Sequence, residues 1–195
     1  MKHPSNRDLF AYWNERRGER LAPERGDIEP SAIRQVLGDT FVLEVGGTAR
    51  HPFRLAGTRL CALFGRELKG ESFVKLWQPS GQAAIHELIV VVMEEKVGVV
   101  AQVTGATADD GLLPVNLELL LLPLVGQAHA EARLLGAMAP LVAPYWLGTK
   151  AAGPLTLGMF RHIGPAVEPA VPPRLRAPLG RLRHGLTVYD GGRPG

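Results

Sequence analysis

Three extended segments follow one another in the middle of the chain and constrain its fold more than any other feature. They are expected at residues 99–104, 112–122 and 132–139. In the second segment, apolar residues occupy every second position from 115 to 121, which predicts a strand with one buried face. Asp110-Gly111, just before it, is a strong signal for a hairpin turn. The sequence therefore predicts an antiparallel sheet.

A hairpin and a helical block precede these strands. The hairpin is expected at residues 41–45 and 52–55, short helices at 58–64 and 73–77, and a longer helix at 80–96. The apolar residues of the longer helix recur at helical spacing, although its run 89–92 is also compatible with a strand. Strands that flank a helical block predict an α+β domain with helices on one face of the sheet.

An amphipathic helix is expected at the N-terminus, before the hairpin. Ser5 and Asp8 have the spacing of a helix cap, and the helix is expected to end near Gly18. Its large apolar side chains form a candidate dimer surface, because they supply more apolar area than a small sheet edge covers. They are Leu9, Phe10, Tyr12 and Trp13. The alternative is that the helix folds back over its own sheet.

Length and composition indicate one folded domain with a tail. The chain has 195 residues, 46% of them hydrophobic, which is enough for one core. We expect an N-terminal helix and linker at 1–25, the domain at 26–142 and an extension at 143–195. Proline and glycine are frequent in the extension, so no fixed structure is expected beyond about residue 164.

Charge and cysteine usage restrict the partners and the compartment. The formal net charge of +3 comes largely from arginines of the tail, without interleaved aromatic residues, so nucleic-acid binding is not expected. The apolar runs are too short to span a membrane, and no signal peptide is visible. Cys61 is the single cysteine, so no internal disulfide is possible. We expect a cytoplasmic protein.

Two arginines on either side of a Gly-Thr break are candidate ligand anchors. Arg54 and Arg59 flank Gly57 and Thr58, where guanidinium groups and free backbone N–H groups would attract an anion or a polar ligand. Alternatively, Arg54 points away from the sheet and Thr58 only caps the following helix. The glycines do not match a phosphate-binding loop.

Three separated segments resemble those of one protein family. They are AYWNERRGERLAPERGDIEP at 11–30, RLAGTRLCALFGRELKG at 54–70, which Phe73 and Trp77 follow, and PYWLGTKAAGPLTLGMFRHI at 144–163. In these segments the sequence resembles a family of bacterial PAS-like proteins, mostly alphaproteobacterial, with a single PAS domain and a short C-terminal extension. The resemblance implies a five-stranded antiparallel sheet whose inner face and central helices enclose a small cavity.

The resemblance implies a sensory or interaction module. We expect a regulatory homodimer that binds a small molecule or a signalling protein and transmits the signal through packing. Candidate ligand-binding residues are Arg54, Thr58, Arg59, Phe64 and Trp77. One alternative is an interaction scaffold with a filled core and no ligand. Another is an enzyme on a small hydrophobic substrate, but no nucleophile and base stand together in the sequence, so an enzyme is not expected.

The identity of any cofactor stays open. His86 lies on the longer predicted helix, and haem-binding PAS proteins take an axial histidine from a comparable helix. Cys61 lies where light-sensing PAS relatives carry a flavin-reactive cysteine, but the flavin-binding signature around it is absent. Cys61 is therefore interpreted as a core residue. The histidines show no metal-binding spacing, so no metal site is expected.

Overall fold

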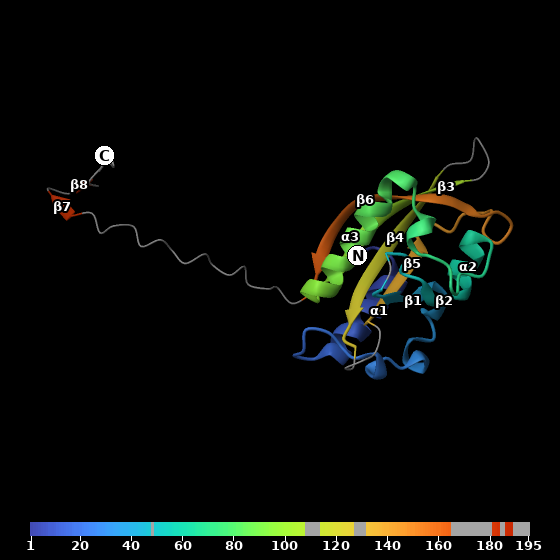
Figure 1. Ribbon diagram of the computed structural model, residues 1–195, viewed down its shortest axis with the longest axis horizontal. Coiled ribbons are helices and arrows are strands. Elements are labelled where there is room, and N and C mark those ends of the chain that lie inside the picture. The colour runs from blue at the N-terminus through green and yellow to red at the C-terminus, as the bar shows by residue number, and fades with distance from the viewer. Residues whose placement is uncertain (48, 108–113, 127–131, 165–180, 184–185, 189–195) are drawn as a thin grey trace. The chain divides into compact units, whose positions relative to one another are not determined.

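The computed structural model describes residues 1–47, 49–107, 114–126, 132–164, 181–183 and 186–188 (Figure 1). The chain divides into two units, Met1–Pro165 and Ala166–Gly195. In the second unit, the described residues form two short antiparallel strands, β7 (Arg181–Arg183) and β8 (Leu186–Val188). The predicted turn at 108–111 lies outside the described residues, as does most of the tail beyond 164.

The first unit is an α+β domain with an antiparallel sheet, as expected. Its elements, with η for 3-10 helices, are α1 (Pro4–Arg17), η1 (Arg25–Asp27), η2 (Pro30–Ile33), η3 (Leu37–Asp39), β1 (Thr40–Val45), β2 (Phe53–Ala56), α2 (Thr58–Phe64), η4 (Val74–Leu76), η5 (Pro79–Gly81), α3 (Gln82–Glu95), β3 (Gly98–Thr107), β4 (Val115–Leu124), β5 (Ala132–Pro140) and β6 (Ala152–Ile163). The strand order is β2-β1-β5-β4-β3-β6. The alternative strand at 89–92 is wrong, because α3 includes these residues.

The sheet of the first unit has six described strands instead of the five that we expected. The additional strand, β6, lies within the segment interpreted as an extension and pairs with β3. Leu155 is fully buried and Leu157 partly buried against the main core, so β6 adds to that core. The pairing also covers an edge of β3 that would otherwise stay open.

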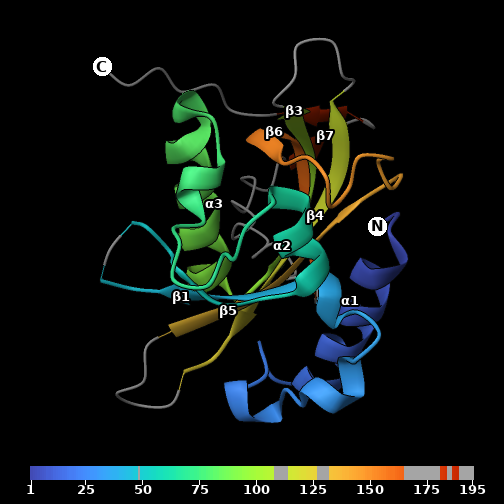
Figure 2. The same ribbon diagram turned by 90° about the vertical axis from the view of Figure 1, so that its right-hand side faces the viewer.

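The inner face of the sheet carries the larger core. Helices α2 and α3 pack on this face, and α3 buries the stripe that its spacing predicts (Figure 2). The buried stripe of α3 consists of Ile85, Leu88, Ile89, Val92 and Met93. Strand β4 contributes Leu117, Leu119 and Leu121 from the alternating segment. None of the described helices is long and apolar enough to cross a membrane.

Helix α1 covers the opposite, outer face of the sheet (Figure 2). Leu9 and Trp13 are 0% exposed there and pack against apolar residues of β4 and β5. The Trp13 indole N–H also donates a hydrogen bond of 2.9 Å to the Pro123 carbonyl. Leu9 and Trp13 are therefore unavailable as a dimer surface, and the alternative, in which α1 folds back over its own sheet, describes the structure. Phe10 and Tyr12 are only partly buried against this core, and a homodimer stays a prediction.

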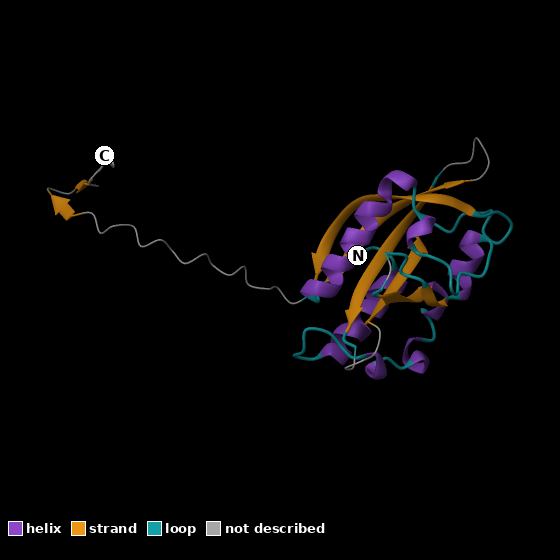
Figure 3. Cartoon of the chain, viewed as in Figure 1, coloured by secondary structure: helices purple, strands orange, loops and turns teal. Residues whose placement is uncertain are grey.

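Short 3-10 helices and loops connect α1 to β1 (Figure 3). Ala22, Ile28, Ile33 and Val36 of this connection are buried in the outer core beside α1. The connection ends at Asp39, directly before β1. It therefore brings a carboxylate to the place where α1 and α2 approach the same end of β1.

Candidate functional site

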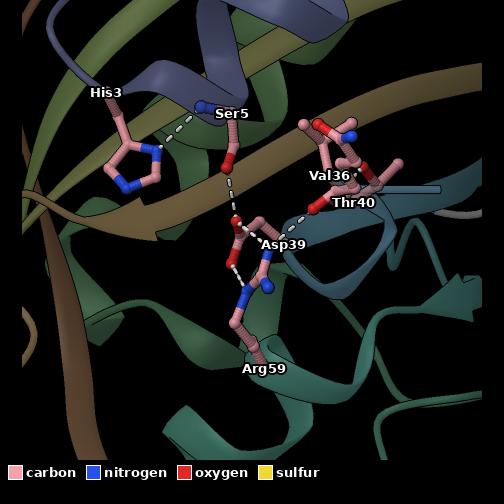
Figure 4. Close-up of polar contacts among 7 residues, drawn as sticks. His3, Ser5, Val36, Asp39, Thr40 and Arg59 are labelled. Carbon is pink, nitrogen blue, oxygen red and sulfur yellow. Dashed lines mark hydrogen bonds and ion pairs between the residues drawn. The ribbon is translucent and has the colours of Figure 1, made fainter. Parts of the chain in front are cut away.

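A buried carboxylate joins three segments that are far apart in the sequence (Figure 4). The Ser5 hydroxyl of α1 donates a hydrogen bond of 2.6 Å to Oδ2 of Asp39. Arg59 of α2 donates to the same carboxylate from Nε at 2.8 Å and from Nη2 at 2.7 Å. Asp39 is 3% exposed, whereas Arg59 is half exposed. We call Ser5, Asp39 and Arg59 the Asp39 junction.

The electrostatics of the Asp39 junction favour its ionised form. Burial alone would raise the pKa of Asp39, but the hydrogen bonds and charge of Arg59, with the Ser5 hydroxyl, hold this pKa below its ordinary value of 3.8. The stabilisation is therefore complete above the ordinary pKa and is lost as the pH falls through the lowered one. At neutral pH the junction is an intact ion pair, and its carboxylate also accepts a hydrogen bond from the Ser5 hydroxyl of α1.

Gly57 allows α2 to start close to η3. A Cβ atom at Gly57 would overlap the Leu37 carbonyl and the Gly38 backbone, so only glycine permits this approach. Gly57 is also the N-cap of α2, where no side chain caps the helix. Thr58 is thus the first residue of α2, exposed, and not its cap. The close approach puts Arg59 within reach of Asp39.

A second buried carboxylate holds the beginning of α1 on the outer face. Glu118 of β4 is 5% exposed and accepts hydrogen bonds from the backbone N–H groups of Lys2, at 2.6 Å, and His3, at 3.0 Å. The Asn6 side-chain amide donates to the same carboxylate at 3.1 Å. The His3 ring accepts from the Ser5 N–H at the helix start (Figure 4). The start of α1 is therefore fixed by Asp39 on one side and by Glu118 on the other.

The five candidate ligand-binding residues do not meet in one site. Arg59 belongs to the Asp39 junction, and Thr58 is exposed beside it. Arg54 extends from β2 toward the Glu44 carboxylate, 3.2 Å away. Phe64 and Trp77 are 2% and 1% exposed and belong to the main core. Nothing in the structure unites these side chains around a single ligand.

Aromatic rings fill the space between the inner face and the short helices. Phe41, Phe53, Phe73 and Trp77 make ring contacts with centroids 5.4–5.7 Å apart. Phe41 also lies over Gly136 of β5, where a Cβ atom would overlap its ring. This aromatic cluster occupies a region where the resemblance led us to expect a cavity. Its one unsatisfied polar atom is Nε1 of Trp77, which is buried without a described partner.

A histidine pair links the β1–β2 connection to α3. Nε2 of His51 lies 2.8 Å from Nδ1 of His86, and the rings are stacked. Burial and the neighbouring His86 lower the pKa of His51 from 6.5 to about 4. His86 thus meets another histidine through Nδ1, and Nδ1 of His51 is buried with no described partner. Sequence reasoning did not single out His51, because no local spacing connects it to His86.

Cys61, which lies where light-sensing relatives carry a reactive cysteine, is partly buried. Cys61 packs against the main core, and burial raises the pKa of its thiol, which disfavours a reactive thiolate. No group of three or more histidine, cysteine or acidic side chains in the described part of the chain could hold a metal ion.

Comparisons with known proteins identify one family. A family model described as PAS domain matches residues 1–139. No curated protein matches the chain. Four chains of solved structures match, among them one titled "Structure of an RNA-binding Light-Oxygen-Voltage Receptor". That match has 17% identity and a TM-score of 0.43, and it covers 61% of this chain. It spans 35% of the receptor chain, so this chain matches only about a third of the receptor's length.

Proposed function

Since the chain belongs to the PAS domain family, we propose that it is a sensory or regulatory module that responds to a small ligand or a signalling protein by a change in packing. The observation that carries this proposal is the Asp39 junction, which ties α2 to α1. These helices pack on opposite faces of the sheet. A movement of α2 would thus be transmitted to α1 through the hydrogen bonds of Asp39.

The route runs through hydrogen bonds that depend on one another. If α2 moves, Arg59 withdraws from Asp39, and the buried carboxylate keeps only the Ser5 hydroxyl as a side-chain donor. A buried charge without its counterion is costly, so the segment that carries it must move toward water. That movement would pull on the beginning of α1 through Ser5. The proposed response needs no catalytic step. The presence of a single cysteine, Cys61, is compatible with a reducing, cytoplasmic setting.

Asp39→Asn tests this coupling. Asparagine keeps the shape of the side chain but loses the ion pair with Arg59 and weakens its acceptor for Ser5. We expect the backbone amides of α1 to exchange hydrogen about ten-fold faster or more, because hydrogen bonds to a charged group are lost at its first turn. The amides of α3, which contributes no residue to the junction, should keep their exchange rates. Hydrogen exchange followed by mass spectrometry measures both.

Arg66→Gln is the matched control for that experiment. Arg66 also forms an arginine–carboxylate pair, with Glu71 at 2.9 Å, but both side chains are exposed and neither belongs to the Asp39 junction. This variant should leave the exchange of α1 unchanged. Equal acceleration of α1 and α3 in Asp39→Asn would show global destabilisation, and faster exchange confined to α2 would show no coupling. Either result contradicts the proposal.

The aromatic cluster favours a second candidate, an interaction scaffold that binds no ligand in its core. Four rings pack where a core ligand would lie, so a partner would act on the surface instead. Native mass spectrometry and an absorbance spectrum of the freshly purified protein separate the candidates. Extra mass or a cofactor band supports a core ligand, whereas the mass of the bare chain favours the scaffold.

A further inference from the structure

An open groove of about 650 Å³ lies at the edge of the sheet beside β2. Its charged lining residues are Glu44, Arg50, Arg54 and Lys69. The chain after α2 runs directly along Phe53 of β2: Gly70 N–H donates to the Phe53 carbonyl at 2.7 Å, and Phe53 N–H donates to the Glu71 carbonyl at 2.9 Å. These backbone bonds hold Phe53 and Gly70, which both line the groove, in place beside each other.

The charges of the groove are unbalanced. Among the described residues, Glu44 is the one carboxylate in the lining, and it lies 3.2 Å from Arg54 and 3.1 Å from Arg133. Arg50 and Lys69 form no ion pair with any described residue. With three cations and one carboxylate, the described lining carries a formal net charge of two positive units.

The acidic residues beside the groove are already engaged elsewhere. The Glu71 carboxylate is bound by Arg66 at 2.9 Å. The Glu67 carboxylate accepts the backbone N–H groups of Leu68 and Lys69, and the charge of Lys69 acts on it without an ion pair. Neither carboxylate lines the groove. No described carboxylate therefore neutralises the excess positive charge, which is available to a ligand.

We propose that this groove binds a small organic dianion, either a phosphate monoester or a dicarboxylate. Two negative charges match the net charge of the lining, and the volume suits a metabolite. Arg50 and Arg54 would bind the planar or tetrahedral anion through their guanidinium groups, and Lys69 would add a point charge. The dianion would be the small ligand of the sensory role proposed above, so its biological meaning rests on that proposal. Its binding can be tested independently.

The test is a titration of the 15N-labelled protein with methyl phosphate, succinate and, as a monoanion, acetate, at pH 7.5 and constant ionic strength. A phosphate monoester is dianionic at this pH. We expect saturable amide shifts centred on Phe53, Lys69 and Gly70 for at least one dianion, and none for acetate. Tighter binding of methyl phosphate identifies a phosphate site, and tighter binding of succinate a dicarboxylate site.

Two variants are expected to change the affinity in opposite directions, so a loss of folding cannot explain both results. Arg50→Gln combined with Lys69→Gln should raise the dissociation constant about ten-fold or more, because two charge-assisted contacts are lost. Lys75→Gln, an exposed lysine outside the groove, is the matched control and should leave it unchanged. Glu44→Gln removes the carboxylate of the groove and should tighten binding, an effect that misfolding cannot imitate.

Three outcomes would overturn the groove assignment. They are shifts that spread over the surface without saturation, an unchanged dissociation constant in the double variant, and no tightening in Glu44→Gln. None of these bears on hydrogen exchange in Asp39→Asn, so failure of the groove and failure of the packing route remain distinguishable.

Discussion

Trp13→Ala is expected to lower the free energy of unfolding by about 3–5 kcal/mol, the usual cost of truncating a fully buried tryptophan. The indole is 0% exposed between α1 and the outer face of the sheet. Its removal leaves a cavity there and takes away the donor to the Pro123 carbonyl. Urea denaturation followed by circular dichroism gives the free energy directly.

Tyr145→Ala is the control for the truncation of an aromatic side chain. Tyr145 is 85% exposed, so its loss should change the free energy of unfolding by no more than about 0.5 kcal/mol. A Trp13→Ala protein as stable as the parent but shifted from dimer to monomer in light scattering would contradict the burial of Trp13 within its own chain. Such a result would restore α1 as a dimer surface.

Acid is expected to destabilise the fold between about pH 6.5 and pH 4 through His51. The pKa of this side chain is about 4 in the folded chain, against its ordinary 6.5. As the pH falls below 6.5, the unfolded chain takes up a proton that the folded chain refuses, so stability declines until the pH reaches the folded pKa. For one buried histidine the total loss is on the order of 3 kcal/mol. Denaturation at a series of pH values measures this decline.

His51→Gln should flatten the decline, because glutamine does not titrate. His162→Gln is the matched control: His162 is exposed, so this variant should keep the pH dependence of the parent. An equally steep decline in His51→Gln would show that another group causes it. Asp39 does not confuse the measurement, since its contribution is lost only below its ordinary pKa of 3.8.

The periodic elements could be predicted from the sequence because their pattern reflects one buried face. The helix expected at 80–96 is α3, and the alternating segment that ends at residue 122 lies largely in β4. Strand β6 was missed because two glycines, Gly153 and Gly158, and several exposed residues of an edge strand obscure its alternation. Its identity as a strand depends on pairing with β3, which is about 55 residues earlier in the chain.

The candidate site could be predicted only in part. The sequence pointed to Arg59, because it follows a Gly-Thr break at a predicted helix start. It pointed to Ser5 only as a helix cap and did not point to Asp39; these residues lie 54 and 20 positions earlier and carry no local signal of burial. His86 was singled out alone, and its contact with His51, 35 positions earlier, could not be predicted. Contacts of this kind depend on the tertiary fold, which spacing along the chain does not encode.

The position of α1 determines how strongly the outer face of the sheet can bind anything else. A partner that competes for β4 and β5 binds only molecules in which α1 has opened, so its apparent affinity is reduced by the fraction of open molecules. Every 1.4 kcal/mol that holds α1 closed costs such a partner about ten-fold in affinity. The free energy that holds α1 closed comes in part from the contacts of Asp39, Glu118 and Trp13. Any event that weakens one of these contacts would make the outer face of β4 and β5 more accessible to a partner.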